Sequence, residues 1–375
     1  MSSVRKRILP SGAIRWLVSY RDGSGRRRFK QFPTRKAAEN WSARTHIEVL
    51  DGTHVAEADS LTLARVAEAW RSHIRSEVMA NRMERSTGEY YEGLLDNHVL
   101  DPEVGVGMVK MNRLNLPTTN LFRDRLLESR SGGVTRRSIS VLKLIIDYGI
   151  GRGWATINHA KDIRIRRSSR LKPKTNVPSA EDVRAVMENC QNPFRTIFII
   201  AAFCGLRASE VYGLEWCDID FDAAELGVRQ RVDPYGRIGE PKSAAGERIV
   251  PMGRFTLNAL RQWRLQCGDA SGLVFKNRAG KPLDHHNVHP RWFKPAFTIK
   301  DECGNIIREI PRFRFHDLRH FAISLWISQD FSPKQVMTFA GHSSITITFD
   351  RYGHLFPEPE SLASVMSEAE LRVVG

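Results

Sequence analysis

The sequence predicts a multidomain fold that is mainly α-helical and contains small β-sheets. The chain has 375 residues, and at roughly 100–200 residues per domain this length corresponds to two or three domains with their own cores. Charge is unevenly distributed, and the hydrophobic pattern changes along the chain from strand-like to helical and then to a mixture of both. These observations divide the chain into a basic N-terminal module, a helical segment and a larger C-terminal domain.

The N-terminal module, residues 1–58, is the most basic part of the chain. Its first 44 residues contain twelve Lys and Arg against Asp22 and Glu39, a net charge of +10. The stretches IRWLVSY and RRRFKQF predict two strands joined by an Asp-Gly and Ser-Gly turn, and a helix follows from Thr34 to about Leu50. So much charge on a small module favours DNA or RNA binding over the alternative, a solvated surface. The expected phosphate contacts are Arg26, Arg27, Arg28 and Lys30.

Residues 59–165 are predicted to form a helical domain. Helical patterns occur in LARVAEAWRSHI, around Glu89 to Val99, in NLFRDRLLES and in VTRRSISVLKLIIDYGI. In the last of these, apolar Leu142, Ile145 and Ile146 share one helix face, whereas Arg136 and Arg137 mark a polar, basic face.

A basic linker, residues 166–178, is expected after the helical domain. The surrounding stretch KDIRIRRSSRLKPKTNVPS contains two prolines and favours contact with phosphate rather than regular structure. The candidate DNA contacts in this stretch are Arg164, at the end of the helical domain, and Arg166 and Arg167 in the linker.

The C-terminal domain, residues 179–375, is predicted to be mixed α+β. Ser179 with Asp182 resembles a capping box and opens a helix through Met187. The apolar stretch PFRTIFIIAAFCG predicts a buried helix ended by Gly205. Three β runs are expected at Leu226–Val232, Arg237–Glu240 and Arg248–Pro251, and the chain from Phe255 is expected to be chiefly helical.

The composition restricts the possible functions. A net charge of +15 favours polyanionic partners. The most apolar stretch, Thr196 to Leu206, is too short for a membrane span, which needs about 20 residues. Five cysteines without a CxxC pair argue against a disulfide framework or a zinc ribbon. The polar, basic residues after Met1 do not predict a secretory signal, so we expect a cytoplasmic, nucleoid-associated protein without a membrane partner.

Candidate chemical groups lie in the C-terminal domain. Arg207 directly follows the buried helix and its glycine, where it is expected to be exposed or to face a cleft. In FRFHDLRHFAISLWI, about 100° per residue places His316, Arg319 and His320 on one helix face, opposite the apolar residues. We expect these three groups to project away from the core toward an anion.

Five motifs in this domain occur in a fixed order: GLRASEV around Arg207, KSAAGERIVP from Lys242, HDLRH from His316, AGHSS around His342 and FDRYGH around Tyr352. With them the chain resembles the tyrosine recombinases of the bacteriophage-integrase type over nearly its full length. The resemblance implies an arm-type DNA-binding domain at residues 1–58, a helical, SAM-like core-binding domain at 59–165 and a catalytic domain at 179–375.

The resemblance also implies a metal-free and cofactor-free reaction. Tyr352 is expected to attack the scissile phosphate and form a 3′-phosphotyrosyl link, while Arg207 and Arg319 hold the phosphate oxygens. Lys242 is expected to be the general acid. His316 accepts the tyrosine proton or helps to hold the phosphate, and His342 donates a hydrogen bond to it, with the division of roles left open. Glu210 either orients Arg207 or is an exposed helix carboxylate.

The expected partners follow from this reaction. They are double-stranded DNA attachment sites, a homotetramer assembled on DNA through a Holliday junction, and optionally a DNA-bending host factor and a directionality factor. The outcome is integration or excision of a mobile element. An apolar stripe in the tail then suggests docking on the same or a neighbouring protomer, through Leu362, Val365, Met366, Ala369 and Val373.

Four alternatives were weighed. HDLRH superficially resembles the HExxH helix of zinc hydrolases, but Arg319 places a positive charge beside the proposed metal. A second alternative is a two-metal nuclease site built from Glu210, Glu215, Asp218 and Asp220. The others are a non-catalytic DNA-binding protein and a type IB topoisomerase.

Overall fold

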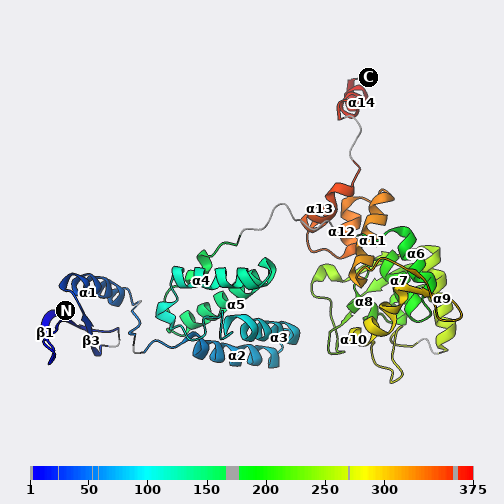
Figure 1. The fold of residues 1–375 in the computed structure, drawn as a ribbon. Helices are drawn as coiled ribbons and strands as arrows, with labels where there is room; N and C mark the ends of the chain where they lie inside the picture. The colour runs from blue at the N-terminus through cyan, green and yellow to red at the C-terminus, as the bar shows by residue number, and fades with distance from the viewer. Residues whose placement is uncertain are drawn as a thin grey trace. The chain divides into compact units, whose positions relative to one another are not determined.

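The structure is a computed structural model that describes residues 3–23, 25–52, 54–57, 59–165, 177–268, 271–357 and 362–374. These residues belong to two compact units, Met1–Arg170 and Leu171–Gly375 (Figure 1). Helices predominate and the sheets are small, which confirms the predicted fold class. No helix among the described residues is long and apolar enough to cross a membrane.

The first unit begins with a three-stranded antiparallel sheet and one helix. Its strands are β1 (Ser3–Ile8), β2 (Ile14–Arg21) and β3 (Arg27–Phe32), paired in the order β1-β2-β3. The helix α1 (Arg35–Leu50) is capped by Thr34, and its Trp41 packs on Tyr20 at a ring-centroid distance of 5.1 Å. The sequence analysis missed β1, because its consecutive basic residues Arg5, Lys6 and Arg7 are exposed and interrupt any apolar alternation.

The rest of the first unit is a helical bundle. Its helices are α2 (Leu63–Met79), α3 (Arg85–Leu94), which continues into a π-helical turn (Leu95–Val99), α4 (Leu116–Ser129) and α5 (Gly132–Gly151). The predicted apolar face of α5 is buried, since Leu142, Ile145 and Ile146 are each 1% exposed or less. Phe122 and Trp70 pack into the same core.

The described residues of the second unit contain most of the helices and three small sheets. Its helices are α6 (Ala180–Asn189), α7 (Phe194–Phe203), α8 (Ala208–Gly213), α9 (Arg254–Cys267), α10 (His285–Val288), α11 (Phe315–Ser328), α12 (Pro333–Ala340), α13 (Ile345–Tyr352) and α14 (Leu362–Val374). Its strands are β4 (Ile219–Asp220), β5 (Glu225–Val228), β6 (Arg231–Val232), β7 (Ile238–Gly239), β8 (Arg248–Pro251), β9 (Thr298–Lys300) and β10 (Ile306–Glu309). The sheets are β4-β5-β8, β6-β7 and β9-β10.

The core of the second unit is built around α7, which packs against α11. Gly205 follows α7 with a φ of +63°, and a Cβ there would lie 2.8 Å from the ring of Trp326 on α11. Only glycine fits this turn without displacement. The turn leads directly to Arg207 at the start of α8.

One β prediction in this unit is corrected by the structure, and one hairpin was not predicted. The run Leu226–Val232 is not one strand, because β5 pairs with β8 whereas β6 pairs with β7. The chain after Phe255 also contains the hairpin β9-β10, whose second strand is fully exposed and shows no inward apolar face.

The predicted domain boundaries stay predictions. The two compact units meet in sequence at Arg170, inside the stretch proposed as a linker. Most of that linker, including Arg166 and Arg167, lies outside the described residues.

Candidate active site

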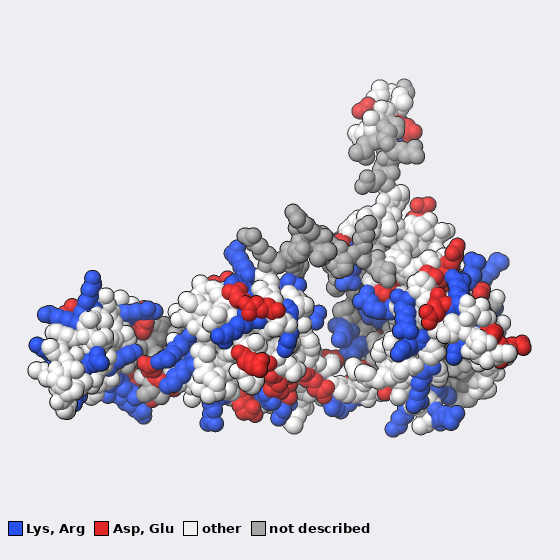
Figure 2. Space-filling model, in the orientation of Figure 1, with Lys and Arg blue, Asp and Glu red and all other residues white. Residues whose placement is uncertain are grey.

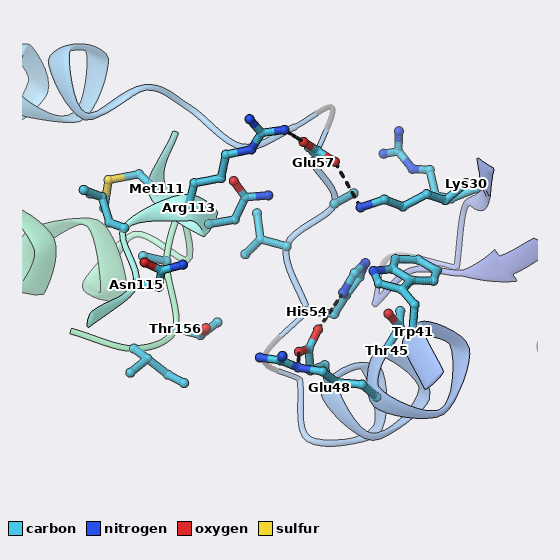
Figure 3. A pocket seen from close by; sticks show the side chains of 18 of the residues that line it. Lys30, Trp41, Thr45, Glu48, His54, Glu57, Met111, Arg113, Asn115 and Thr156 are labelled. Carbon is cyan, nitrogen blue, oxygen red and sulfur yellow. Dashed lines mark hydrogen bonds and ion pairs between the residues drawn. The ribbon is translucent and has the colours of Figure 1, made fainter. Parts of the chain in front are cut away.

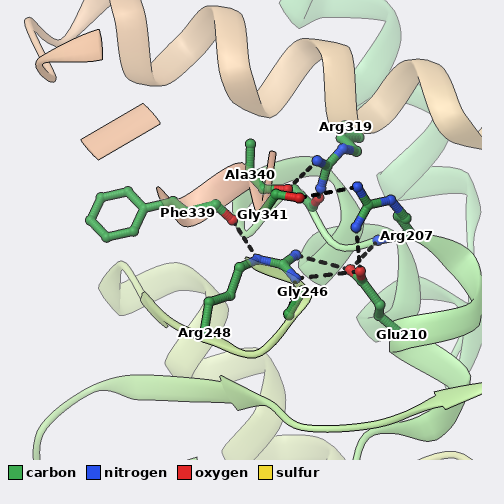
Figure 4. Close-up of polar contacts among 9 residues, drawn as sticks. Arg207, Glu210, Gly246, Arg248, Arg319, Phe339, Ala340 and Gly341 are labelled. Atoms are coloured by element: carbon green, nitrogen blue, oxygen red, sulfur yellow. Dashed lines mark hydrogen bonds and ion pairs between the residues drawn. The ribbon is translucent and has the colours of Figure 1, made fainter. Parts of the chain in front are cut away.

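The buried carboxylate of Glu210 holds two arginine side chains together (Figure 4). Nη1 of Arg207 donates to Glu210 Oε1 at 2.6 Å, and Nη2 of Arg248 donates to Oε2 at 2.9 Å. Burial raises the pKa of Glu210, but Arg248 and Arg207 outweigh burial and lower this pKa to about 2. The carboxylate is therefore ionised at neutral pH and orients Arg207. Of the two readings of Glu210, the exposed helix carboxylate is wrong.

The C-terminal end of α12 binds three arginine side chains on successive carbonyl oxygens (Figure 4). The donors and acceptors are Arg248 Nε to Phe339 at 2.7 Å, Arg319 Nη2 to Ala340, and Arg207 Nη2 to Gly341 at 3.4 Å. The last carbonyls of a helix lack partners within the helix and carry the negative end of its dipole, so they favour cations. Three arginines from different motifs are thereby fixed directly before His342.

Gly341 allows this close approach. Its φ is +60°, and a Cβ at this position would lie 2.9 Å from the carbonyl oxygen of Ala245 and 3.0 Å from Nη1 of Arg248. The loop that follows Lys242 therefore packs directly against the end of α12.

Arg319 is almost fully buried, with 2% of its surface exposed, and its Nη1 donates to the carbonyl of Gly205 at 2.7 Å. Burial and the nearby Arg207 lower its pKa to about 9, so the guanidinium remains charged at neutral pH. The Arg207 side chain is 38% exposed. A phosphate can therefore reach Arg207 with less rearrangement than it needs to reach Arg319.

Tyr352 ends α13 and is buried between two histidines. Its hydroxyl is hydrogen bonded to Nδ1 of His320, and its ring is stacked on His342 with an interplanar angle of 12°. Nδ1 of His342 lies 2.9 Å from Oγ1 of Thr348. Residues from three motifs therefore meet at the tyrosine.

The protonation states at this site follow from burial. Burial lowers the pKa of His320 to about 4 and that of His342 to about 3, and for His342 the nearby Arg319 and Arg207 add to the effect. Burial raises the pKa of Tyr352 to about 12. At neutral pH the two imidazoles are neutral and the phenol keeps its proton.

The expectation that His316, Arg319 and His320 all project away from the core is wrong for two of them. Only His316 is exposed, because contacts with the end of α12 cover Arg319 and contact with Tyr352 covers His320. Burial, together with Arg319 and Arg207, lowers the pKa of His316.

Lys242 lies on an exposed loop between β7 and the turn Ala244–Gly246. Figure 4 draws the hydrogen bonds that join Glu210, three arginines and the end of α12, and Lys242 is not among the residues labelled there. Its loop is nevertheless anchored at the site, because Nη1 of Arg248 donates to the carbonyl of Gly246 at 2.8 Å.

Sequence reasoning missed the roles of Arg248 and His320. Arg248 lies in the KSAAGERIVP motif, where Arg248 and Val250 are buried and Ile249 is exposed. A charged residue at an inward position of a strand is the signal that could have found it.

The basic residues expected to bind DNA are distributed over both parts of the first unit. Figure 2 shows Lys and Arg prominent on the sheet and α1, whereas the helical part carries both signs. Arg26, Arg27, Arg137 and Arg164 are exposed, and Arg136 is half-buried. Arg28 pairs with Asp22 at 2.9 Å and with Asp59, so part of its charge is already neutralised.

A cavity of about 710 Å³ lies in the first unit (Figure 3). Glu57 is on its wall, where Oε2 accepts from Nζ of Lys30 at 3.1 Å and Oε1 accepts from Arg113. These bonds, with the nearby positive charges, lower the pKa of Glu57. Lys30, expected to contact phosphate, therefore has an acidic partner within the chain.

The residues of the two metal-site alternatives are engaged elsewhere. His320 is bonded to Tyr352, Glu210 pairs with two arginines, and Asp220 accepts from backbone N–H groups of its own turn. Within the described ranges, no group of three or more His, Cys, Asp or Glu side chains is arranged to hold a metal ion.

Sequence comparisons match the chain to known integrases and recombinases. Residues 177–358 match the model of the phage integrase family. A XerC-like tyrosine recombinase of Caldanaerobacter subterraneus subsp. tengcongensis is 25% identical, and the alignment covers 92% of each chain. The ICEBs1 integrase of Bacillus subtilis is 24% identical, over 73% of this chain and 76% of its own length.

Solved structures show the same fold. The Tn1549 transposon integrase in complex with a circular intermediate DNA matches with a TM-score of 0.62 at 18% identity, covering 83% of this chain and 99% of that chain. A lambda integrase tetramer bound to a Holliday junction matches with a TM-score of 0.59 at 16% identity, covering 95% of this chain and 97% of that chain.

The fold of this chain is therefore that of the solved integrase structures. Residues 177–358 form a phage integrase family domain, and the matches together support a tyrosine recombinase that acts as a site-specific DNA recombinase.

Proposed function

We propose that the chain cuts and rejoins DNA through a 3′-phosphotyrosyl intermediate in which Tyr352 is the nucleophile. The phenolic oxygen attacks the scissile phosphorus, the bond to the 5′ oxygen breaks, and the phenolic proton passes to a base. The bond energy is conserved in the protein–DNA link, so the reverse attack by a 5′ hydroxyl rejoins the strand without ATP.

The remaining roles are assigned by reach and charge. Arg207 and Arg319 neutralise the non-bridging oxygens as negative charge develops, and His342 donates a hydrogen bond to the phosphate. Lys242 protonates the leaving 5′ oxygen, because its exposed loop is anchored to the site through Arg248. His316 accepts the tyrosine proton or helps to hold the phosphate. The observation that carries the assignment is the convergence of Arg207, Arg319 and His342 at the end of α12 beside Tyr352.

The basic residues of the first unit serve DNA recognition in this proposal. Residues 1–58 bind arm-type sites and residues 59–165 bind the core site, with a basic linker at 166–178 between them and the catalytic domain. The contacts are made by Arg26, Arg27, Arg28, Lys30, Arg136, Arg137, Arg164, Arg166 and Arg167. Such contacts fix position on the duplex and make binding salt-dependent.

The reaction is proposed to proceed through a Holliday junction in a homotetramer, integrating or excising a mobile element. The relatives support this proposal through their names, which include the ICEBs1 integrase, a transposon integrase with circular intermediate DNA and a lambda integrase tetramer on a Holliday junction. A DNA-bending host factor and a directionality factor are optional partners. The site of action is the nucleoid.

The covalent intermediate is tested with a nicked suicide substrate carrying the core attachment site. Cleavage releases a short strand, which prevents rejoining and traps the adduct for denaturing electrophoresis. The wild-type protein is expected to give the adduct, whereas Tyr352→Phe binds the same DNA without forming it. An adduct formed by the Phe variant would show that Tyr352 is not the nucleophile. Chelators are expected to leave the wild-type reaction unchanged.

A further inference from the structure

Arg248 connects three segments of the site while having almost no contact with solvent. Its side chain is 2% exposed. The guanidinium reaches the carboxylate of Glu210, the carbonyl of Gly246 and the carbonyl of Phe339 (Figure 4). These acceptors belong to α8, to the loop after Lys242 and to the end of α12.

This burial and these bonds separate Arg248 from the arginines that can meet DNA. All three of its nitrogens donate to protein acceptors, so little donor capacity is left for a phosphate. A buried charge is costly unless it is paired and hydrogen bonded, and a hydrophobic residue would fill a strand position at lower cost. The arginine therefore supplies geometry that an apolar side chain cannot supply.

We propose that Arg248 is a positioning residue for strand cleavage, which sets the place of Arg207 through Glu210 and the place of the α12 end through Phe339. The proposal rests on the role of Arg207 in holding the scissile phosphate. Without Arg248, Glu210 keeps Arg207 as its main cationic partner and draws it toward the protein. The carbonyl of Phe339 loses its donor, two residues before Gly341 accepts from Arg207.

Lysine cannot replace this arginine. A lysine ammonium is a single nitrogen, whereas the three acceptors are met by separate nitrogens of a planar fork. Arg248→Lys keeps the charge beside Glu210 but loses the simultaneous bonds. This variant distinguishes positioning from charge neutralisation.

The test compares two suicide substrates, one with an ordinary scissile phosphate and one with an uncharged methylphosphonate. A clamp that neutralises phosphate oxygens matters less when the group is uncharged. We expect Arg248→Lys and Arg248→Gln to slow cleavage of the phosphate substrate by about 10²-fold, as displacement of a catalytic group by about 1 Å does. Cleavage of the methylphosphonate is expected to change by less than about threefold, and DNA affinity is expected to be retained.

Arg229→Gln is the matched control. Arg229 lies in the same domain and pairs with Asp218 at 3.4 Å, outside the network of Glu210. It is expected to leave the ratio of the two cleavage rates unchanged. Equal slowing of both substrates by the Arg248 variants would show a merely structural role and overturn the proposal.

Two further variants complete the experiment. The double variant Glu210→Gln with Arg248→Gln removes both buried charges. It is therefore expected to fold even if the unpaired carboxylate of Glu210 destabilises Arg248→Gln. It is still expected to cleave the phosphate substrate slowly. Recovery of phosphate cleavage in this variant would also overturn the proposal. Arg207→Lys tests the proposed role of Arg207 separately from that of Arg248. If this variant leaves the ratio of the two cleavage rates unchanged, the proposed role of Arg207 is wrong. If it shifts the ratio and the Arg248 variants do not, only the positioning role of Arg248 is refuted.

Discussion

Nδ1 of His320 is hydrogen bonded to the hydroxyl of Tyr352, and both side chains are buried. Because the pKa of His320 is lowered to about 4 and that of Tyr352 is raised to about 12, both groups are neutral at neutral pH. In the imidazole tautomer with its proton on Nε2, the phenol donates to Nδ1, which is the acceptor. The bond holds the hydroxyl on α13 against α11, and it gives His320 a place in the site that the HDLRH motif alone did not show.

Loss of this acceptor is expected to impair cleavage. In His320→Phe the buried phenol keeps its ring contacts but loses the partner of its hydroxyl, so we expect adduct formation to slow by about 10²-fold. His320→Gln retains an acceptor and is expected to lose less. Single-turnover cleavage of the suicide substrate measures both, with the exposed His286→Phe as control. Equal rates for the Phe and Gln variants would contradict a role for the acceptor.

The two buried histidines make stability depend on pH. The folded-state pKa values are about 4 for His320 and about 3 for His342, below the value of about 6.5 expected when the chain is unfolded. Between these limits the unfolded state binds more protons, so stability is lost as the pH falls from about 6.5 toward 4, at about 1.4 kcal/mol per pH unit for each histidine. Urea unfolding at several pH values measures this slope.

His342→Gln removes one of the two contributions and is expected to make the pH dependence shallower. Its matched control is His286→Gln, which changes an exposed histidine. A slope that is the same in wild type and His342→Gln would show that His342 does not titrate in this way.

The sequence predicted the parts of the fold that depend on strong local patterns. The apolar run of α7 and the face of α5 with Leu142, Ile145 and Ile146 required no tertiary information, because burial follows directly from their spacing. Short strands such as β6 and the exposed hairpin β9-β10 gave no such pattern. Their partner strands β7 and β10 are fully exposed, so no alternation of buried and exposed residues marks the pairing.

The candidate site shows the same division. The order of the motifs predicted that Arg207, His342 and Tyr352 belong to one site. In the structure these residues lie together around the end of α12. The contacts of Arg248 could not be predicted, because its acceptors on α8 and α12 are 38 and 91 residues away. Helical spacing placed His320 on a face but did not reveal that α13 covers that face.

Lys242 is expected to act on the leaving group. Lys242→Ala should slow cleavage strongly with an oxygen leaving group, because the 5′ oxygen needs a proton as it departs. A substrate in which sulfur replaces that oxygen needs no proton and is expected to restore most of the rate. Suicide-substrate cleavage measures all four combinations. If the variant cleaves the sulfur substrate no faster than the oxygen one, Lys242 positions DNA instead.

Glu57 is expected to weaken DNA binding by the first unit. Its carboxylate pairs with Lys30 and Arg113, so Glu57→Gln frees two cations and removes one negative charge. We expect tighter binding to attachment-site DNA and a slope of log affinity against log salt that is steeper by up to about 2, at roughly −0.9 for each added phosphate contact. Glu39→Gln removes the same charge from an exposed pair with Arg35 and is the control. An equal effect of both substitutions would indicate net charge alone.

The tail helix α14 (Leu362–Val374) is expected to couple protomers during strand exchange. Its apolar side chains Met366 and Val373 lie seven residues apart, on one helix face, and are 60% and 87% exposed. A short helix with such a face is stabilised when another surface covers it. In the proposed tetramer four active sites act around one junction, so a neighbouring protomer is the proposed cover. Ending the chain after Pro359 should then leave single-site DNA binding and suicide-substrate cleavage largely intact. Tetrameric complexes and recombination are expected to decrease. Native gels and sedimentation of protein–DNA complexes measure the change in assembly. Met366→Ser with Val373→Ser tests the face without shortening the chain, and truncated protein that assembles tetramers as the wild type does would refute docking between protomers.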